Sequence, residues 1–383
     1  MKYLTLDVET NISNKGNPFD LTNKLMLVGL KDKGIYDIEY SVDPYKELLD
    51  TIQNAVDEAD VLVGFNIKFD LHWLQRYGIV FKDKRIWDCQ LVEFILKNQS
   101  QPYPSLNAVA EYYELGTKLD EVKENYWKND IDTDKVPLDI LTDYLLQDLA
   151  LTEKVMYEQI KELESRPELK RLISLHNQDL MVLQEMEFNG LNFEYDWSNT
   201  LGHELEEQIA KLNARLFKYH NYPDFNPNSV DHLSAFLYGG NIKAKRQVLI
   251  GEYKTGPKKG EDKYKWEEYS IPFERKVTPI KGSELAKEGL YSTDEKTIKS
   301  LKGNKEAMEI LNIILTRATL EKRMTTYYFG LTKLTDQMNW KKGKIHGQLN
   351  QCVAKTGRLS SSKPNLQNFD GEIKTLFTSN YGD

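Results

Sequence analysis

The spacing of the apolar residues changes near residue 168, and this change predicts two regions that fold differently. Before it, residues 3–9 alternate apolar and polar side chains and residues 61–65 form a short apolar run. These are the patterns of a half-buried strand and a fully buried strand. After it, apolar residues recur at helical spacing over long stretches, beginning with the stripe from Trp197 to Leu216. We therefore predict an α/β region followed by a mainly α-helical region.

The α/β region is predicted to hold a mixed sheet with helices packed on it. In residues 3–9, the alternation of apolar and polar side chains predicts a strand with one face packed against a core and the other face open. The other expected strands are 24–31, 35–40 and 61–65, and the expected helices are 44–57, 67–77, 88–97, 105–114 and 138–164.

The helical region is predicted to contain an antiparallel helical arm, a β-hairpin and little other strand. The stripe from Trp197 to Leu216 and a second one from Ile310 to Tyr327 could form the arm. Between them, residues 241–282 are rich in glycine and lysine. Residues 247–254 and 263–270 read as the two arms of a hairpin, with a glycine-containing turn between them.

The bulk properties exclude several classes of protein. A length of 383 residues favours two or more domains, and the chain has no apolar run long enough for a membrane span. The N-terminus does not read as a signal peptide, and two distant cysteines allow no disulfide framework, so we expect a cytoplasmic protein. The formal net charge of −8 argues mildly against a simple nucleic-acid clamp. It does not argue against an enzyme that gathers carboxylates around metal ions.

Asp7 and Glu9 form the first candidate site. They are two residues apart on a predicted strand, so both side chains leave the same face. Two neighbouring carboxylates repel each other unless a positive charge lies between them. A solvated strand face is the alternative explanation of this pair, and the pair alone does not exclude it.

Two further pairs have helical spacing. Asn66 and Asp70 follow the predicted strand 61–65, at a strand-to-helix junction of the kind where ligands bind in α/β sheets. Tyr144 and Asp148 are four apart within the predicted helix 138–164 and so share one face of it. Taken singly, Asn66 could be a helix cap, and the other pair could be a buried tyrosine and a surface aspartate.

The three segments together resemble, in order and type, the three exonuclease motifs of the DnaQ-like superfamily, in its tyrosine-containing branch. They are Asp7-Val8-Glu9, Asn66-Ile67-Lys68-Phe69-Asp70 and Tyr144-Leu145-Leu146-Gln147-Asp148. The resemblance implies a ribonuclease H-like 3′-to-5′ DNA exonuclease domain over residues 1–165. It also implies two Mg²⁺ ions, with Mn²⁺ as an alternative. Two ions generate hydroxide and stabilise the charge of phosphodiester hydrolysis, and carboxylates are the hard ligands they prefer.

The resemblance also implies a role for each residue. Asp7 would bridge both ions, Glu9 and Asp148 would hold the ion that carries the attacking water, and Asp70 would hold the other. Tyr144 would orient the nucleophile through its hydroxyl. Asn66 would contact the terminal nucleotide of a single-stranded DNA 3′ end.

The second half is similar to the front of the polymerase domain in family A DNA polymerases. The segment from Thr356 to Asn368, which reads TGRLSSSKPNLQN, carries most of this resemblance. It implies a thumb at 166–340, with 241–282 as a hairpin insert, and the start of a palm at 341–383. Arg358, Asn365 and Gln367 would bind minor-groove acceptors that all correct base pairs share, and Lys322 would meet backbone phosphate. The implied partner is primer–template DNA.

The chain departs from this family after Asn368. The palm strand with the first catalytic aspartate, the nucleotide-binding helix of the fingers and the later His-Asp pair do not follow. We therefore expect either a partial chain or a split polymerase in which a second polypeptide supplies palm and fingers. An exonuclease at the very start of the chain resembles compact phage polymerases, which would place the protein in a bacterial host cytoplasm.

Two other functions fit the same motifs. One is a DNA-binding or assembly subunit of a split polymerase whose exonuclease site is silent. The other is a free-standing RNA-processing exonuclease of the RNase D type, against which the segment from Thr356 to Asn368 argues. The intact carboxylate set favours an active proofreading exonuclease.

Overall fold

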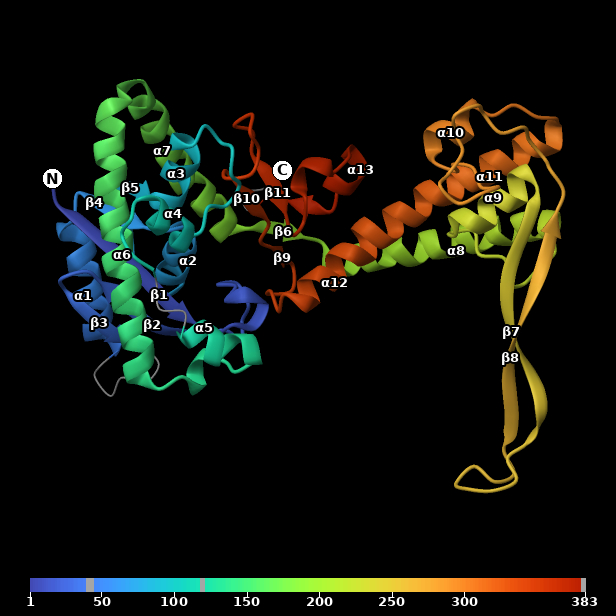
Figure 1. The fold of residues 1–383 in the computed structure, drawn as a ribbon, viewed down its shortest axis with the longest axis horizontal. Helices are drawn as coiled ribbons and strands as arrows, with labels where there is room; N and C mark the ends of the chain where they lie inside the picture. The colour runs from blue at the N-terminus through green and yellow to red at the C-terminus, as the bar shows by residue number, and fades with distance from the viewer. Residues whose placement is uncertain (39–44, 118–120, 380–383) are drawn as a thin grey trace. The chain divides into compact units, whose positions relative to one another are not determined.

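The computed structural model describes residues 1–38, 45–117 and 121–379 (Figure 1). The chain forms two compact units, here called unit 1 and unit 2. Unit 1 is discontinuous and consists of Met1–Tyr195 and Leu331–Asp383, whereas unit 2 is Asp196–Gly330. These borders differ from the predicted domain borders near 165 and 340, and the three-domain division stays a prediction.

The main sheet of unit 1 is mixed, as predicted. Its strand order is β3-β2-β1-β4-β5, with β1 antiparallel to β2 and parallel to β4. The strands are β1 (Tyr3–Thr10), β2 (Leu25–Leu30), β3 (Gly34–Asp37), β4 (Val61–Gly64) and β5 (Arg85–Asp88). Strand β5 was not predicted, because its two apolar residues, Ile86 and Trp87, form neither a longer apolar run nor an alternating pattern. Residues 39–44, at the end of one predicted strand and the start of the first predicted helix, lie outside the described residues.

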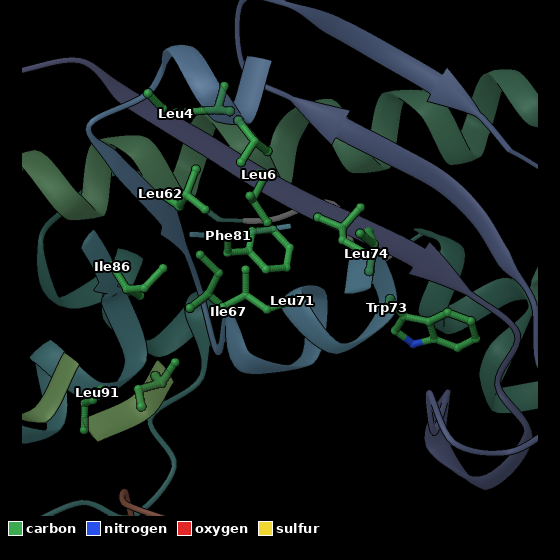
Figure 2. Packing of buried hydrophobic residues seen from close by; sticks show 14 of the residues in the cluster. Leu4, Leu6, Leu62, Ile67, Leu71, Trp73, Leu74, Phe81, Ile86 and Leu91 are labelled. Carbon is green, nitrogen blue, oxygen red and sulfur yellow. The ribbon is translucent and has the colours of Figure 1, made fainter. Parts of the chain in front are cut away.

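Helices cover both faces of this sheet. They are α1 (Tyr45–Glu58), α2 (Lys68–Arg76), α3 (Cys89–Leu96), α4 (Leu106–Tyr112), α5 (Glu121–Asn125), α6 (Leu138–Ser165) and α7 (Lys170–Asn189). On one face, Leu6 of β1, Leu62 of β4 and Leu71 of α2 belong to one buried cluster (Figure 2). On the other face α6 packs on β1, so the prediction of an open face there is wrong, and Thr5 and Glu9 are buried.

The C-terminal part of the chain returns to unit 1 and adds small strands. Strand β6 (Leu191–Phe193) pairs with both β9 (Lys344–Ile345) and β12 (Phe377–Thr378). Strand β10 (Gln348–Asn350) pairs with β11 (Ser360–Ser362), and helix α13 (Gly371–Lys374) follows. Ile345 and Ile373 are fully buried, so this part has apolar packing of its own.

Unit 2 contains the predicted antiparallel arm. Helix α8 (Tyr195–His220) lies beside α11 (Lys305–Lys322) and the π-helical turn Arg323–Tyr328 that continues it. Arg317 donates to Asn213 over 2.6 Å, and the Ser198 hydroxyl donates to the Tyr328 carbonyl over 3.0 Å. Asn213, late in α8, thus contacts Arg317, whereas Ser198, early in α8, contacts Tyr328 further along the second helix, which is the antiparallel arrangement. Helix α12 (Phe329–Gln337) then leads back to unit 1.

The predicted hairpin is present in unit 2 and is longer than expected. Strands β7 (Gly240–Glu252) and β8 (Asp262–Phe273) pair along most of their length. At its base, Ile242, Ala244 and Ile271 are buried in the apolar cluster of unit 2, together with α9 (Val230–Tyr238) and α10 (Glu295–Ser300). In the described part of the chain, no helix is both long and apolar enough to cross a membrane.

Candidate active site

Strand β1 brings Asp7 and Glu9 to the side of the sheet that α6 covers. Asp7 lies opposite Gly29 and Glu9 lies opposite Leu27 on β2, so the central position of β1 fixes both side chains. Asp7 is half-buried, and Glu9 is 6% exposed. A glutamate this buried is uncommon unless it binds a cation or a hydrogen-bond donor.

Asp70 reaches the same place from helix α2. It is buried, and its carboxylate accepts a hydrogen bond of 3.1 Å from the Val8 amide, which also contacts the carboxylate of Asp7 at 3.1 Å. Burial, together with the negative charge of Asp7, raises the pKa of the Asp70 carboxyl well above its usual value. The fold therefore holds two acids closer together than two negative charges prefer, and a bound cation would remove that cost.

Helix α6 supplies Asp148 from above the sheet. Carboxylate oxygens of Asp7, Glu9 and Asp148 all lie within 4.8 Å of one another. Tyr144 lies one helical turn before Asp148, is buried, and packs its ring edge-to-face on Trp127 at 5.5 Å between ring centroids. The structure thus brings the four predicted acids together and places Tyr144 one turn from Asp148 on α6.

The donor set suits a hard divalent cation. Mg²⁺ and Mn²⁺ take carboxylate oxygens, and three carboxylates from two elements can meet on one ion at the spacing seen here. Asp7 and Asp70 share the Val8 amide as hydrogen-bond donor, so Asp7 lies next to Asp70 as well as within 4.8 Å of Glu9 and Asp148. This arrangement is compatible with Asp7 as a shared ligand.

Asp88 fixes the junction between β4 and α2 and was not predicted as a site residue. Its buried carboxylate accepts from the amides of Asn66 at 3.3 Å and Ile67 at 3.0 Å, and it caps α3 through the Leu91 amide at 3.0 Å. Asn66 has a φ of 62°, a left-handed conformation that asparagine tolerates better than most residues. Asp88 holds this turn and so places α2, which carries Asp70. The only signal in the sequence was its position in the segment Trp87-Asp88-Cys89.

A cavity of about 310 Å³ opens beside Asn66. The side chain of Asn66 is exposed, as expected for a residue that meets a ligand, and it is not the helix cap. Residues from six separate segments of unit 1 line the cavity, including Asn17, Pro18, Phe19, Lys68, Phe69, His72, Gln90, Tyr103, Glu187, His346, Gln348 and Asn350. Sequence reasoning singled out Asn66 alone. Lys68 and Phe69 belong to the same motif segment, and the other residues come from segments with no common motif.

A buried ionic cluster lies along one wall of this cavity. The Glu187 carboxylate of α7 accepts hydrogen bonds from Lys68 at 2.7 Å and from the Leu349 amide at 2.5 Å. It also lies 2.9 Å from His72 Nε2. Burial alone would raise the pKa of Glu187, but the hydrogen bond from His72 and the charge of Lys68 outweigh it, and the pKa lies below its usual value. The cluster ties α2 to the C-terminal part of unit 1.

The residues predicted to contact duplex DNA lie in both units. In unit 1, Arg358, Asn365 and Gln367 are exposed, and the Gln367 amide donates to the Leu359 carbonyl at 3.1 Å, which draws it next to Arg358. The side-chain oxygen of Asn365 accepts a hydrogen bond of 3.1 Å from the backbone N–H of Gln367. In unit 2, Lys322 is exposed at the end of α11. These three residues of unit 1 form one polar surface.

Gly29 permits the close approach of α6 to the sheet. A Cβ atom at this position would lie 2.7 Å from Leu149 Cδ1 and 2.9 Å from Leu145 Cγ, on either side of Asp148. We expect Gly29→Ala to displace α6, to lower the free energy of unfolding by about 1–3 kcal/mol, and to weaken divalent-cation binding by the carboxylate cluster as Asp148 moves. Thermal unfolding without and with added Mg²⁺ measures the two effects. Gly371→Ala, where a Cβ meets nothing within 4 Å, is the matched control and should change neither.

The comparisons with known proteins agree on one family. The model of DNA polymerase family A matches residues 270–381. DNA polymerase I of Synechocystis sp. is 29% identical over 346 residues, which is 88% of this chain and 30% of that protein. The DNA polymerase of Bacillus phage SP01 is 23% identical over 96% of this chain and 42% of its own length. These comparisons show that the chain is similar to the family A DNA polymerases.

The chain is similar to a defined part of these larger proteins. It spans about a third of the length of the curated relatives just described. Among solved structures, the POL domain of Pol1 from M. smegmatis, in complex with DNA primer-template and dNTP, matches 98% of this chain and 54% of that one. The TM-score is 0.66 at 16% identity, so this likeness concerns the fold.

Proposed function

We propose that unit 1 is a ribonuclease H-like, metal-dependent 3′-to-5′ exonuclease that removes nucleotides from single-stranded DNA ends, in the proofreading part of a family A DNA polymerase. The convergence of Asp7, Glu9 and Asp148 within 4.8 Å, with Asp70 beside Asp7, carries this proposal. A cluster of buried acids costs stability, and metal binding is the function that best explains it.

Each residue of the site would have its own role in hydrolysis. Two bound Mg²⁺ ions would supply an activated water and stabilise the leaving 3′ oxygen. The four carboxylates would hold these ions, with Asp7 between them. Tyr144 would orient the attacking water through its hydroxyl, since it lies one turn from Asp148 on α6. Asn66, exposed beside the cavity, would hold the terminal nucleotide in place.

The polar surface of Arg358, Asn365 and Gln367 supports a second role in the same protein, the binding of primer–template duplex. These groups donate hydrogen bonds to minor-groove acceptors without reading sequence. Lys322 of unit 2 would add a phosphate contact. Templated synthesis would further need palm and fingers, and their supply by a second polypeptide stays a prediction.

A nuclease assay tests the proposal directly. With a 5′-labelled single-stranded DNA, we expect stepwise shortening from the 3′ end in Mg²⁺ or Mn²⁺ and none in EDTA. An RNA oligonucleotide of the same sequence should be shortened far more slowly. Faster digestion of the RNA would favour the RNase D-like alternative. Absence of any shortening with either ion would favour the silent DNA-binding subunit.

A further inference from the structure

The outer half of the β7–β8 hairpin is a free-standing ribbon (Figure 1). Beyond the buried base, residues from Lys245 to Glu252 on β7 and from Asp262 to Glu268 on β8 are exposed, apart from the half-buried Val248. A ribbon without a core adds little to the stability of unit 2. Its side chains are therefore available for a partner.

Large apolar side chains gather on one face of this ribbon. Tyr264 and Trp266 are two residues apart on β8, so they project to the same side about 7 Å from each other. Leu249 lies directly opposite Tyr264 and projects to that side as well. Their exposed fractions are 50% for Tyr264, 62% for Trp266 and 54% for Leu249. Exposed aromatic rings in a row are costly in water and mark a contact surface.

The hairpin carries more positive than negative charge, and the excess lies toward its tip. Residues 240–273 carry eight Lys and Arg against five Asp and Glu, in a chain whose net charge is −8. Near the base, Lys245 pairs with Glu268 and Arg246 with Glu267. Toward the tip, the described structure gives Lys254, Lys258 and Lys259 no ion pair. The cations nearest the tip are thus left for an external anion.

We propose that this face of the hairpin binds single-stranded DNA, with bases stacked on Tyr264 and Trp266 and phosphates held by Lys254, Lys258 and Lys259. Aromatic rings flanked by cations are the usual platform for single strands, because every base offers a flat face for stacking. A duplex hides those faces. A protein partner fits less well, since lysine is depleted from protein interfaces. The proposal is independent of the nuclease site, which lies in unit 1.

The binding test uses a small circular oligothymidylate, which has no 3′ end to enter a nuclease site, in EDTA. Fluorescence anisotropy of the labelled circle should report binding by the whole chain. We expect Tyr264→Ala with Trp266→Ala to weaken it at least about tenfold, because stacking contributes strongly for each base. Trp197→Ala removes another exposed tryptophan, from α8, and should leave the affinity within about twofold, as it removes no stacking surface of the hairpin.

Salt dependence tests the phosphate contacts. Changing Lys254, Lys258 and Lys259 to glutamine should reduce the slope of log affinity against log salt by about 2, at about 0.7 for each single-strand phosphate contact. The same changes at Lys82 and Lys123, exposed lysines of unit 1, should leave the slope unaltered. Unchanged melting of every hairpin variant would show that unit 2 remains folded.

Several results would overturn the proposal. One is failure of the wild-type chain to bind the circle, and another is equal binding by the double aromatic variant. A third is a hairpin variant that weakens binding to a dumbbell duplex with closed ends as much as binding to the circle. That result would show a general charge effect instead of base stacking. Loss of self-association in sedimentation, with binding of the circle unchanged, would assign the face to a second copy of this chain.

Discussion

Asp7→Ala should abolish the release of nucleotides from a single-stranded DNA 3′ end, lowering the rate by at least about 10³-fold. Asp7 is close both to the Glu9–Asp148 pair and to Asp70. Its loss should therefore impair every ion that the cluster holds. A loss of about 4 kcal/mol of transition-state stabilisation corresponds to that factor.

The same variant should remain folded. Asp7 is half-buried and lies beside Asp70, whose pKa its charge raises, so its removal relieves repulsion in the absence of metal. We expect thermal unfolding in EDTA at or above the wild-type temperature, and a smaller gain in stability on adding Mg²⁺. Asp50→Ala removes an exposed aspartate from α1 and is the control. Wild-type activity in Asp7→Ala would remove the proposed site.

Glu187→Ala should lower the free energy of unfolding by about 3–5 kcal/mol. The change leaves the Lys68 ammonium, His72 and the Leu349 amide without their shared acceptor in a buried place. Removal of one partner from a buried ionic cluster costs more than the pair itself contributes, because the remaining charge stays desolvated. Glu185→Ala, on an exposed position of the same helix, should be nearly silent.

The pH dependence gives this prediction a second readout. The pKa of Glu187 is lowered in the folded state, so its contribution is present above the unfolded value near 4.3 and is lost as pH falls through the lower, folded value. Wild type should lose this part of its stability in acid. Glu187→Ala should show a flatter decline there by chemical denaturation. An identical acid profile in both proteins would contradict the assigned cluster.

The sequence predicted much of unit 1 because its strongest signals are periodic. Alternation placed β1 with Asp7 and Glu9, and helical spacing placed Tyr144 with Asp148 on α6. The roles of these residues stay predictions from family resemblance. The hairpin was predicted, but its two strands were predicted too short. Near the base these strands are buried on one side and mixed in polarity, which obscures their pattern.

The contacts between distant segments could not be predicted from the sequence. Asp88 looked like a flanking residue, yet it holds the turn at Asn66 through two backbone amides. Glu187 reads as one acid among several on α7, and only the packing of α7 against α2 brings it to Lys68. Such contacts depend on how elements dock, which no local pattern records.

The interruption of unit 1 by unit 2 has a consequence for synthesis on the ribosome. Unit 2 is continuous, so all of it has emerged before Leu331 appears. In unit 1, β6 can pair with Ile345, and Glu187 can bind the Leu349 amide, only after the fifty or so residues from Leu331 onward have been synthesised. Because domains tend to fold as they emerge, the helical unit 2 should fold first, and nascent unit 1 should be the part exposed to proteases and chaperones.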